Sequence, residues 1–161
     1  CKFHLYETGH LQKLSEKHGI EVYKMICGDT EYSVECGLQV MDGIFDSGKP
    51  LPTAVIAIND FMAMGIMQSV RRHGLLIPED ISILSFDDTF IAKAETPRLT
   101  SVGYNYDRFA NTLVDTAIMA IEGKNPPKMQ LIPPKLMIRS PQQRDSRLRD
   151  SIRYSPDTVV K

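Results

Sequence analysis

The stretch from Thr53 to Asp88 constrains the fold of this chain more than any other. It contains two short apolar runs, Thr53–Ile58 and Ile81–Phe86, with a helical pattern between them. The first run is rich in β-branched residues, which is typical of a strand buried on both faces, whereas the pattern after Asn59 is typical of a helix. A strand, a helix and a second strand in this order predict two parallel strands joined by a right-handed crossover.

Polar residues follow both predicted strands. Asn59 and Asp60 come after the first strand, and Asp87 and Asp88 come after the second. In parallel α/β sheets, ligands bind beyond the carboxyl ends of the strands, so Asn59 and Asp87 are the first candidates for a binding site. Asp60 is expected at the start of the helix, where its side-chain oxygen would accept a hydrogen bond from a free backbone N–H.

The remaining elements extend the same alternation. Hydrophobic spacing and turn residues predict helices over Thr8–His18, Ser33–Ser47, Asp60–His73 and Asp107–Glu122, and further strands over Ile20–Ile26 and Lys135–Arg139. The order of elements indicates an α/β fold, a three-layer arrangement with helices on both faces of a parallel sheet.

Composition excludes several classes of function. The chain has 161 residues and a net charge of −1, so it has no overall basic field that would hold DNA. No apolar run is long enough to cross a membrane, and no secretory signal pattern opens the sequence. Cys1, Cys27 and Cys36 form no CxxC pair, which favours free thiols and a cytoplasmic location. No zinc spacing, GxSxG, HExxH or P-loop is present, so we expect no metal, no cofactor and no enzyme.

The chain resembles the effector-binding domain of LacI/GalR-type transcriptional regulators from about Gly19 to Ser140. The resemblance rests on an ordered set of motifs at family spacing: Pro52-Thr53-Ala54-Val55, Asn59-Asp60 with Met62-Ala63 and Gly65, Pro78-Glu79-Asp80-Ile81-Ser82, Phe86-Asp87-Asp88, Thr96-Pro97 and Leu99-Thr100. It implies one lobe of a periplasmic-binding-protein-like domain and a function in ligand sensing. The implied partners are a small sugar-like effector, a second copy of the chain, and operator DNA contacted only through a helix-turn-helix that this sequence does not contain.

The resemblance also implies which residues bind the effector. Asn59 and Asp87 would bind ligand hydroxyls, Tyr32 would stack on the ligand ring, and Tyr104 would lie at the rim of the cleft. The residues alone allow other roles. Asn59 is also suited to capping, the two aspartates to a solvated turn, and Tyr32 and Tyr106 to core packing.

One position departs from the family. Family members often grip the effector with an arginine at the start of an early helix. The matching position here falls near Glu7, and no arginine lies in Cys1–Gly19. Glu7 and His10 are the polar residues available nearby.

The helix after Asn59 carries a row of methionines. The resemblance implies a dimer contact through Met62, Ala63, Met64 and Met67, whereas a methionine stripe on its own is equally typical of a core.

The resemblance divides the chain into four parts. Residues 1–102 would form the C-terminal lobe, 103–134 a crossover and helix belonging to a second lobe, 135–140 the final strand, and 141–161 a flexible tail. Because the sequence begins at Cys1 and lacks the second lobe, we interpret it as a C-terminal fragment. The helix over 107–122 is expected to pack on another copy or on a rearranged neighbour.

Two alternative functions remain at this stage. A sugar-binding receptor of a transporter has the same fold, although it would require an upstream signal peptide. A sugar-processing enzyme is a third possibility, and turnover of a sugar in an activity assay would support it.

Overall fold

The structure is a computed structural model, and it describes residue 13 and residues 16–22 and 32–139. The helices are α2 (Val34–Asp46), α3 (Asp60–Arg72), α4 (Phe90–Ala94) and α5 (Tyr106–Ile121). The strands are β1 (Ala54–Ile56), β2 (Ser82–Asp87), β3 (Thr100–Gly103) and β4 (Lys135–Met137). The predicted helix 8–18 and strand 20–26 fall largely outside the described residues, as does the tail 141–161.

The four strands form one sheet in the order β1-β2-β3-β4. β1 pairs with β2 and β2 with β3 in parallel, so the predicted strand–helix–strand unit over Thr53–Asp88 is confirmed. β4 returns antiparallel to β3, with Val102 opposite Leu136. The first three strands therefore end at one common edge of the sheet.

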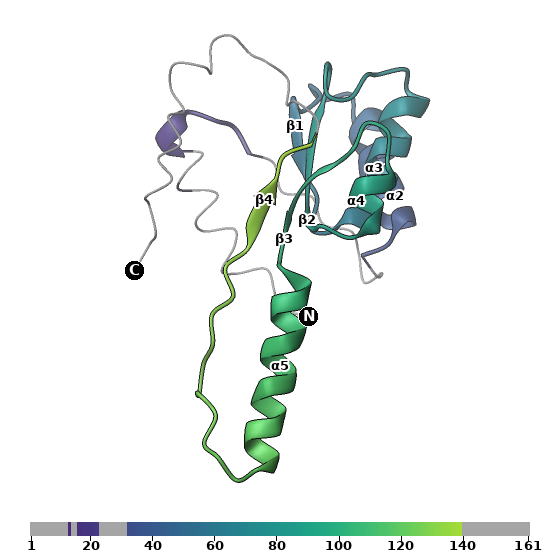
Figure 1. The fold of residues 1–161 in the computed structure, drawn as a ribbon. Coiled ribbons are helices and arrows are strands. Elements are labelled where there is room, and N and C mark those ends of the chain that lie inside the picture. Colours follow the sequence, from purple (N-terminus) through teal and green to yellow (C-terminus); the bar gives the residue numbers. More distant parts are fainter. Residues whose placement is uncertain (1–12, 14–15, 23–31, 140–161) are drawn as a thin grey trace.

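The core lies on one face of this sheet, where α2, α3 and α4 gather (Figure 1). The odd-numbered strand residues Val55 and Ile83, and Leu99 just before β3, belong to this core together with Met67 and Val70 of α3. Even-numbered residues point the other way, and Ile56 is 52% exposed. The expectation that the first strand is buried on both faces is therefore wrong for the described structure, because α2–α4 all cover the same face.

α2 and α3 approach each other closely through two glycines. A methyl group added at Gly37 would lie 2.1 Å from the carbonyl oxygen of Met62, and one at Gly65 would lie 2.0 Å from that of Val34. Each glycine therefore faces the backbone of the opposite helix. The close contact brings Tyr32, just before α2, beside Asn59, just before α3.

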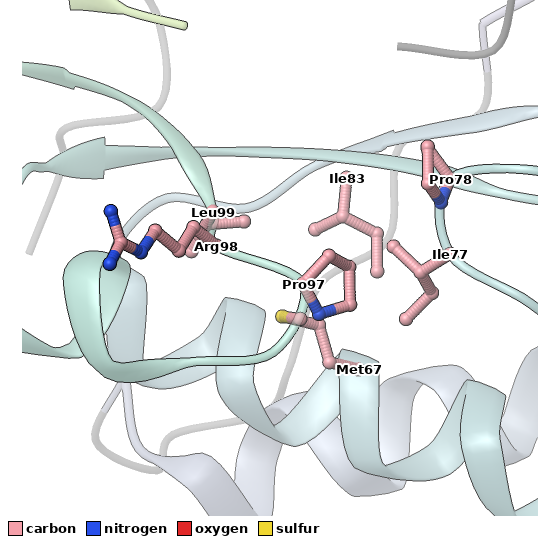
Figure 2. Close-up of a pocket in the computed structure, with 7 residues that line it drawn as sticks. All are labelled: Met67, Ile77, Pro78, Ile83, Pro97, Arg98 and Leu99. Atoms are coloured by element: carbon pink, nitrogen blue, oxygen red, sulfur yellow. The ribbon is translucent and has the colours of Figure 1, made fainter. Parts of the chain in front are cut away.

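A small cavity of about 10 Å³ lies in the core near the amino ends of β2 and β3. Figure 2 shows Pro97 beside Met67, with Ile77 and Ile83 nearby and the Arg98 guanidinium directed away. A space of this size holds about one water molecule at most. It is a packing gap, and it lies at the end of the sheet opposite Asn59 and Asp87.

α5 extends away from the sheet and its three covering helices (Figure 1). None of its residues is buried, and Leu113, Val114 and Ile121 are exposed. An open groove of about 200 Å³ separates α5 from the segment 127–132, whose Gln130 side chain donates a 3.0 Å hydrogen bond to Thr116 Oγ1.

Two further observations concern the chain as a whole. Within the described ranges, every helix is too short or too polar to cross a membrane. Cys36 is buried and disulfide-bonded, so the expectation of free thiols is wrong for this residue. Cys1 and Cys27 lie outside the described residues.

Candidate functional site

Asn59 caps the start of α3. Its Oδ1 accepts a 2.8 Å hydrogen bond from the backbone N–H of Met62, and its Nδ2 donates a 3.0 Å bond to the carbonyl oxygen of Tyr32. The alternative of a strand-end cap is therefore confirmed. Because an amide has two N–H groups and two lone pairs on oxygen, capacity for a ligand remains on the same side chain.

Asp87 ends β2 in an unusual backbone conformation. Its φ is +96° and that of Asp88 is +52°, a region that side chains other than glycine rarely adopt. Gly103, paired with Asp87 on β3, allows this turn, because an added methyl group there would lie 2.2 Å from the Asp88 Cβ. Strained backbone that the surroundings hold in place is typical of binding sites.

The carboxylate of Asp87 is partly buried and free to accept hydrogen bonds. Burial, and then the negative charge of Asp60, raise the pKa of Asp87 above the ordinary aspartate value. Among the residues that the structure describes, none donates a hydrogen bond to this carboxylate. A partly desolvated acceptor without an internal partner is suited to ligand hydroxyl groups.

Three tyrosines lie around Asn59 and Asp87. Tyr32 contacts Asn59 through its carbonyl oxygen, and its own side chain is exposed. Tyr104 follows β3 and is also exposed. The hydroxyl group of Tyr106 donates to the carbonyl oxygen of Asp87, and burial followed by the Asp87 charge raises the Tyr106 pKa. Core packing of Tyr106 is therefore not observed, because half of its surface is exposed.

The neighbouring aspartates have structural roles. Asp88 forms an ion pair with Arg139, and both side chains are largely buried. The Asp88 Oδ1 makes no well-aligned hydrogen bond among the described residues, so this contact is mainly one of charge. The following turn is capped by Thr89, whose hydroxyl accepts from the Ile91 N–H at 3.3 Å, and not by either aspartate.

Asp60 is not a helix cap, contrary to the prediction, because Asn59 takes that role. It is fully buried behind the site and accepts hydrogen bonds from Ser85, Thr89 and Ser101. This buried carboxylate and its partners were not predicted from the sequence. The available signal was the presence of Ser85 and Ser101 in the apolar strands β2 and β3, since a buried hydroxyl group requires a polar partner.

The methionine row on α3 is divided between core and surface. Ala63 and Met67 are fully buried within this chain, so their predicted place in a dimer contact is wrong: no surface remains for a partner to touch. Met62 and Met64 are half-buried. The exposed apolar residues near them are Phe61 and Phe90, at the starts of α3 and α4.

The position near Glu7 and His10, where the family often has an arginine, lies outside the described residues. Within the described ranges, no three His, Cys, Asp or Glu side chains are grouped as a metal site would require.

Comparison with known proteins identifies the fold and its relatives. A family described as "Periplasmic binding protein-like domain" matches residues 2–140. The HTH-type transcriptional regulator DegA of Bacillus subtilis is 30% identical over 77% of this chain and 36% of its own length. The Lac repressor bound to ONPG in the repressed state has a TM-score of 0.70, at 26% identity over 82% of this chain and 39% of its own.

A dimeric Lac repressor with an 11-residue C-terminal deletion is also similar, with a TM-score of 0.74 at 26% identity over 84% of this chain and 49% of its own. The chain thus spans less than half the length of each of these relatives. The relatives are transcriptional regulators and not enzymes. The chain belongs to the periplasmic binding protein-like domain family, in the form that LacI/GalR-type transcriptional regulators use to bind effectors.

Proposed function

We propose that this chain binds a sugar or sugar derivative at the edge formed by Tyr32, Asn59, Asp87 and Tyr104, and that binding controls a DNA-binding regulator. The observation that supports this most is the Asp87 carboxylate. It lies at the carboxyl end of a parallel strand, on strained backbone, without an internal hydrogen-bond donor among the described residues.

The surrounding residues suit a polyhydroxylated ring. Asn59 has donors and acceptors on one planar group, which matches a pair of neighbouring hydroxyl groups. The exposed rings of Tyr32 and Tyr104 offer apolar faces against which a sugar ring can pack. The arrangement favours neutral hydroxyl groups near Asp87, because a phosphate or carboxylate there would meet the charges of both Asp87 and Asp60.

The proposed mechanism is a change in the closure of two lobes. α5 leaves the sheet directly after β3 and the site residue Tyr104, so a second lobe joined through α5 would face the same edge. An effector that contacts both lobes would favour one closure over the other. It can shift that equilibrium only by its difference in affinity for the two states. Induction and corepression both fit this scheme.

Calorimetric titration of the complete regulator tests the proposal. The titrants are neutral hexoses and pentoses, hexose phosphates and hexuronic acids, with and without duplex operator DNA. We expect one class to bind, and we expect Asp87→Ala to weaken its binding roughly tenfold to a hundredfold, the value of a lost charge-assisted hydrogen bond. Asp46→Ala, at the far end of α2, is the control and should bind as the wild type does.

Two results would contradict this site. One is a sugar that binds Asp87→Ala and the wild type equally well. The other is binding that never alters the affinity for DNA, which would favour a receptor of the transporter type.

We further propose a homodimer that acts in the cytoplasm, where the regulator must reach its DNA. Phe61 and Phe90 have exposed rings, and they directly follow Asp60 and Thr89 in the sequence. Because Asp60 and Thr89 hydrogen-bond to each other, the backbones of the two aromatic residues lie close together. An isologous contact through this surface would bury both rings together with the half-buried Met64.

Substitution of Phe90 by glutamate tests the dimer proposal. Phe90 is 73% exposed, so Phe90→Glu should leave the fold unchanged and convert the dimer to a monomer in analytical ultracentrifugation. Glutamate at Leu76, which is also exposed but lies toward the amino ends of the strands, is the matched control and should remain dimeric. A dimer that survives Phe90→Glu would place the interface elsewhere.

A further inference from the structure

Asp60 is a fully buried carboxylate that makes no contact with the ligand in the proposed binding scheme. Its Oδ2 accepts 2.6 Å and 2.8 Å hydrogen bonds from the backbone N–H and hydroxyl group of Thr89. Its Oδ1 accepts a 2.9 Å bond from Ser101 Oγ and another from Ser85 Oγ. Burying a carboxylate is costly unless its oxygens are satisfied, and these four hydrogen bonds offset that cost.

The hydrogen bonds of Asp60 converge on the turn that follows Asp87. Thr89 is bound directly. The N–H of Asp88 donates a 3.0 Å bond to Ser101 Oγ, and that hydroxyl group in turn donates to Asp60. Two consecutive backbone N–H groups are therefore tied to one carboxylate. The first lies between the two residues with positive φ, Asp87 and Asp88, and the second follows directly after them.

We infer that Asp60 is a positioning residue for the effector: through Thr89 and Ser101 it fixes the left-handed turn that directs the Asp87 carboxylate outward. The inference rests on the proposed role of Asp87 in binding. A strained backbone conformation persists only when surrounding bonds hold it, and Asp60 supplies those bonds here. Asp60 has no exposed surface and does not touch the effector itself.

The competing view is that Asp60 only stabilises the core. The two views predict different behaviour for variants that keep the fold. An asparagine at position 60 can still accept from the Thr89 N–H through its oxygen and donate to the serine hydroxyl groups through its nitrogen. An alanine can do neither. Asp60→Asn should therefore preserve the turn, and Asp60→Ala should release it.

Ser101→Ala provides a milder test, because it breaks only the link from Asp60 to the Asp88 N–H. Ser69→Ala is its matched control. Ser69 is also fully buried, and its hydroxyl group also donates to an aspartate, Asp42, but it lies in the second half of α3, away from the turn. A purely stabilising role predicts similar behaviour of the two variants, whereas a positioning role predicts an effect of Ser101→Ala alone.

The first measurement needs no sugar. Backbone scalar couplings and Cα and Cβ chemical shifts from NMR distinguish positive from negative φ at Asp87 and Asp88. We expect positive φ in the wild type, Asp60→Asn and Ser69→Ala, and averaging toward negative φ in Ser101→Ala and Asp60→Ala. If Asp60→Ala does not fold, Ser101→Ala decides the question. Unchanged couplings at both residues in the folded variants would overturn the inference.

The second measurement is affinity for the sugar that the calorimetric panel identifies. We expect Ser101→Ala to weaken binding roughly tenfold and Ser69→Ala to leave it unchanged, with Asp60→Asn closer to the wild type than Asp60→Ala. A released turn with unaltered affinity would refute the positioning role. If no sugar in the panel binds the wild type, the proposed function fails, while the NMR result still shows whether Asp60 holds the turn.

Discussion

Replacing Gly65 by alanine is expected to lower the free energy of unfolding by more than about 3 kcal/mol, beyond the usual range for an overpacked core. The added methyl group would lie 2.0 Å from the Val34 carbonyl oxygen and 2.8 Å from the Leu38 nitrogen. Both are backbone atoms of α2, so no side chain can rotate away. The two helices would have to separate, which would open the core around Met41 and Met67. Urea denaturation followed by circular dichroism measures the effect.

Gly43→Ala is the matched control for this prediction. Gly43 lies within α2, and a methyl group added there would meet nothing within 4 Å. This variant should be more stable than the wild type by about 0.5–1 kcal/mol, because alanine is favoured over glycine in a helix. Gly37→Ala should behave like Gly65→Ala, since it would meet the Met62 carbonyl oxygen at 2.1 Å. Equal stabilities of Gly65→Ala and Gly43→Ala would contradict the close contact between α2 and α3 at Gly65.

The second large effect is that substitutions at the adjacent residues Asp87 and Asp88 should change the stability of the protein in opposite directions. Asp88→Ala should destabilise the protein by about 3–5 kcal/mol, because it leaves the largely buried Arg139 without its ion-pair partner. Asp87→Gly should instead stabilise it by about 1 kcal/mol, because glycine adopts a φ of +96° without strain. Thermal unfolding of the two variants measures both changes, and Asp88→Asn separates the charge from the backbone preference.

The effects of these substitutions on sugar binding should be the reverse of their effects on stability. Asp87→Gly is expected to lose the sugar despite its higher stability, and Asp88→Asn to retain it once folded. Residues that bind ligands are often not optimal for stability, which is the pattern expected here. A stabilised Asp87→Gly variant that still bound the sugar would show that the ligand contact lies elsewhere.

The stability gained on removing the Asp87 charge should depend on pH. Because the folded-state pKa of Asp87 is raised, its ionised form destabilises the folded protein at neutral pH. As pH falls through the raised pKa, the folded state takes up a proton first and the penalty disappears. The advantage of Asp87→Asn over the wild type should thus be greatest near pH 7 and vanish below the ordinary aspartate pKa of about 3.9. Denaturation curves across this range measure it, and an advantage that grew on acidification would contradict the sign.

The sequence allowed the strand–helix–strand unit to be predicted because its pattern is local. The apolar runs, the cap at Asn59 and Gly74 after α3 each follow from neighbouring residues. That Asn59 and Asp87 follow neighbouring parallel strands was also predictable from the order of elements. These inferences needed no knowledge of distant contacts.

What could not be predicted depends on contacts across the sheet. The partners of Asp60 come from β2, β3 and the turn between β2 and α4, 25 to 41 residues away in the sequence. The prediction of which α3 methionines are buried failed for a related reason. Periodicity places Met62, Met64 and Met67 on one helix, but only the position of α2 determines which of them are buried.

The turn held by Asp60 has a consequence for how ligand specificity can evolve. Tyr32, Asp87 and Tyr104 contribute little to the core, whereas Asp60, Ser85 and Ser101 are buried. Mutations at these three proposed ligand-binding positions should therefore not cross the stability threshold that limits most substitutions. Related regulators could acquire new effectors by changing these outer residues while Asp60 and its hydrogen-bond partners stay the same.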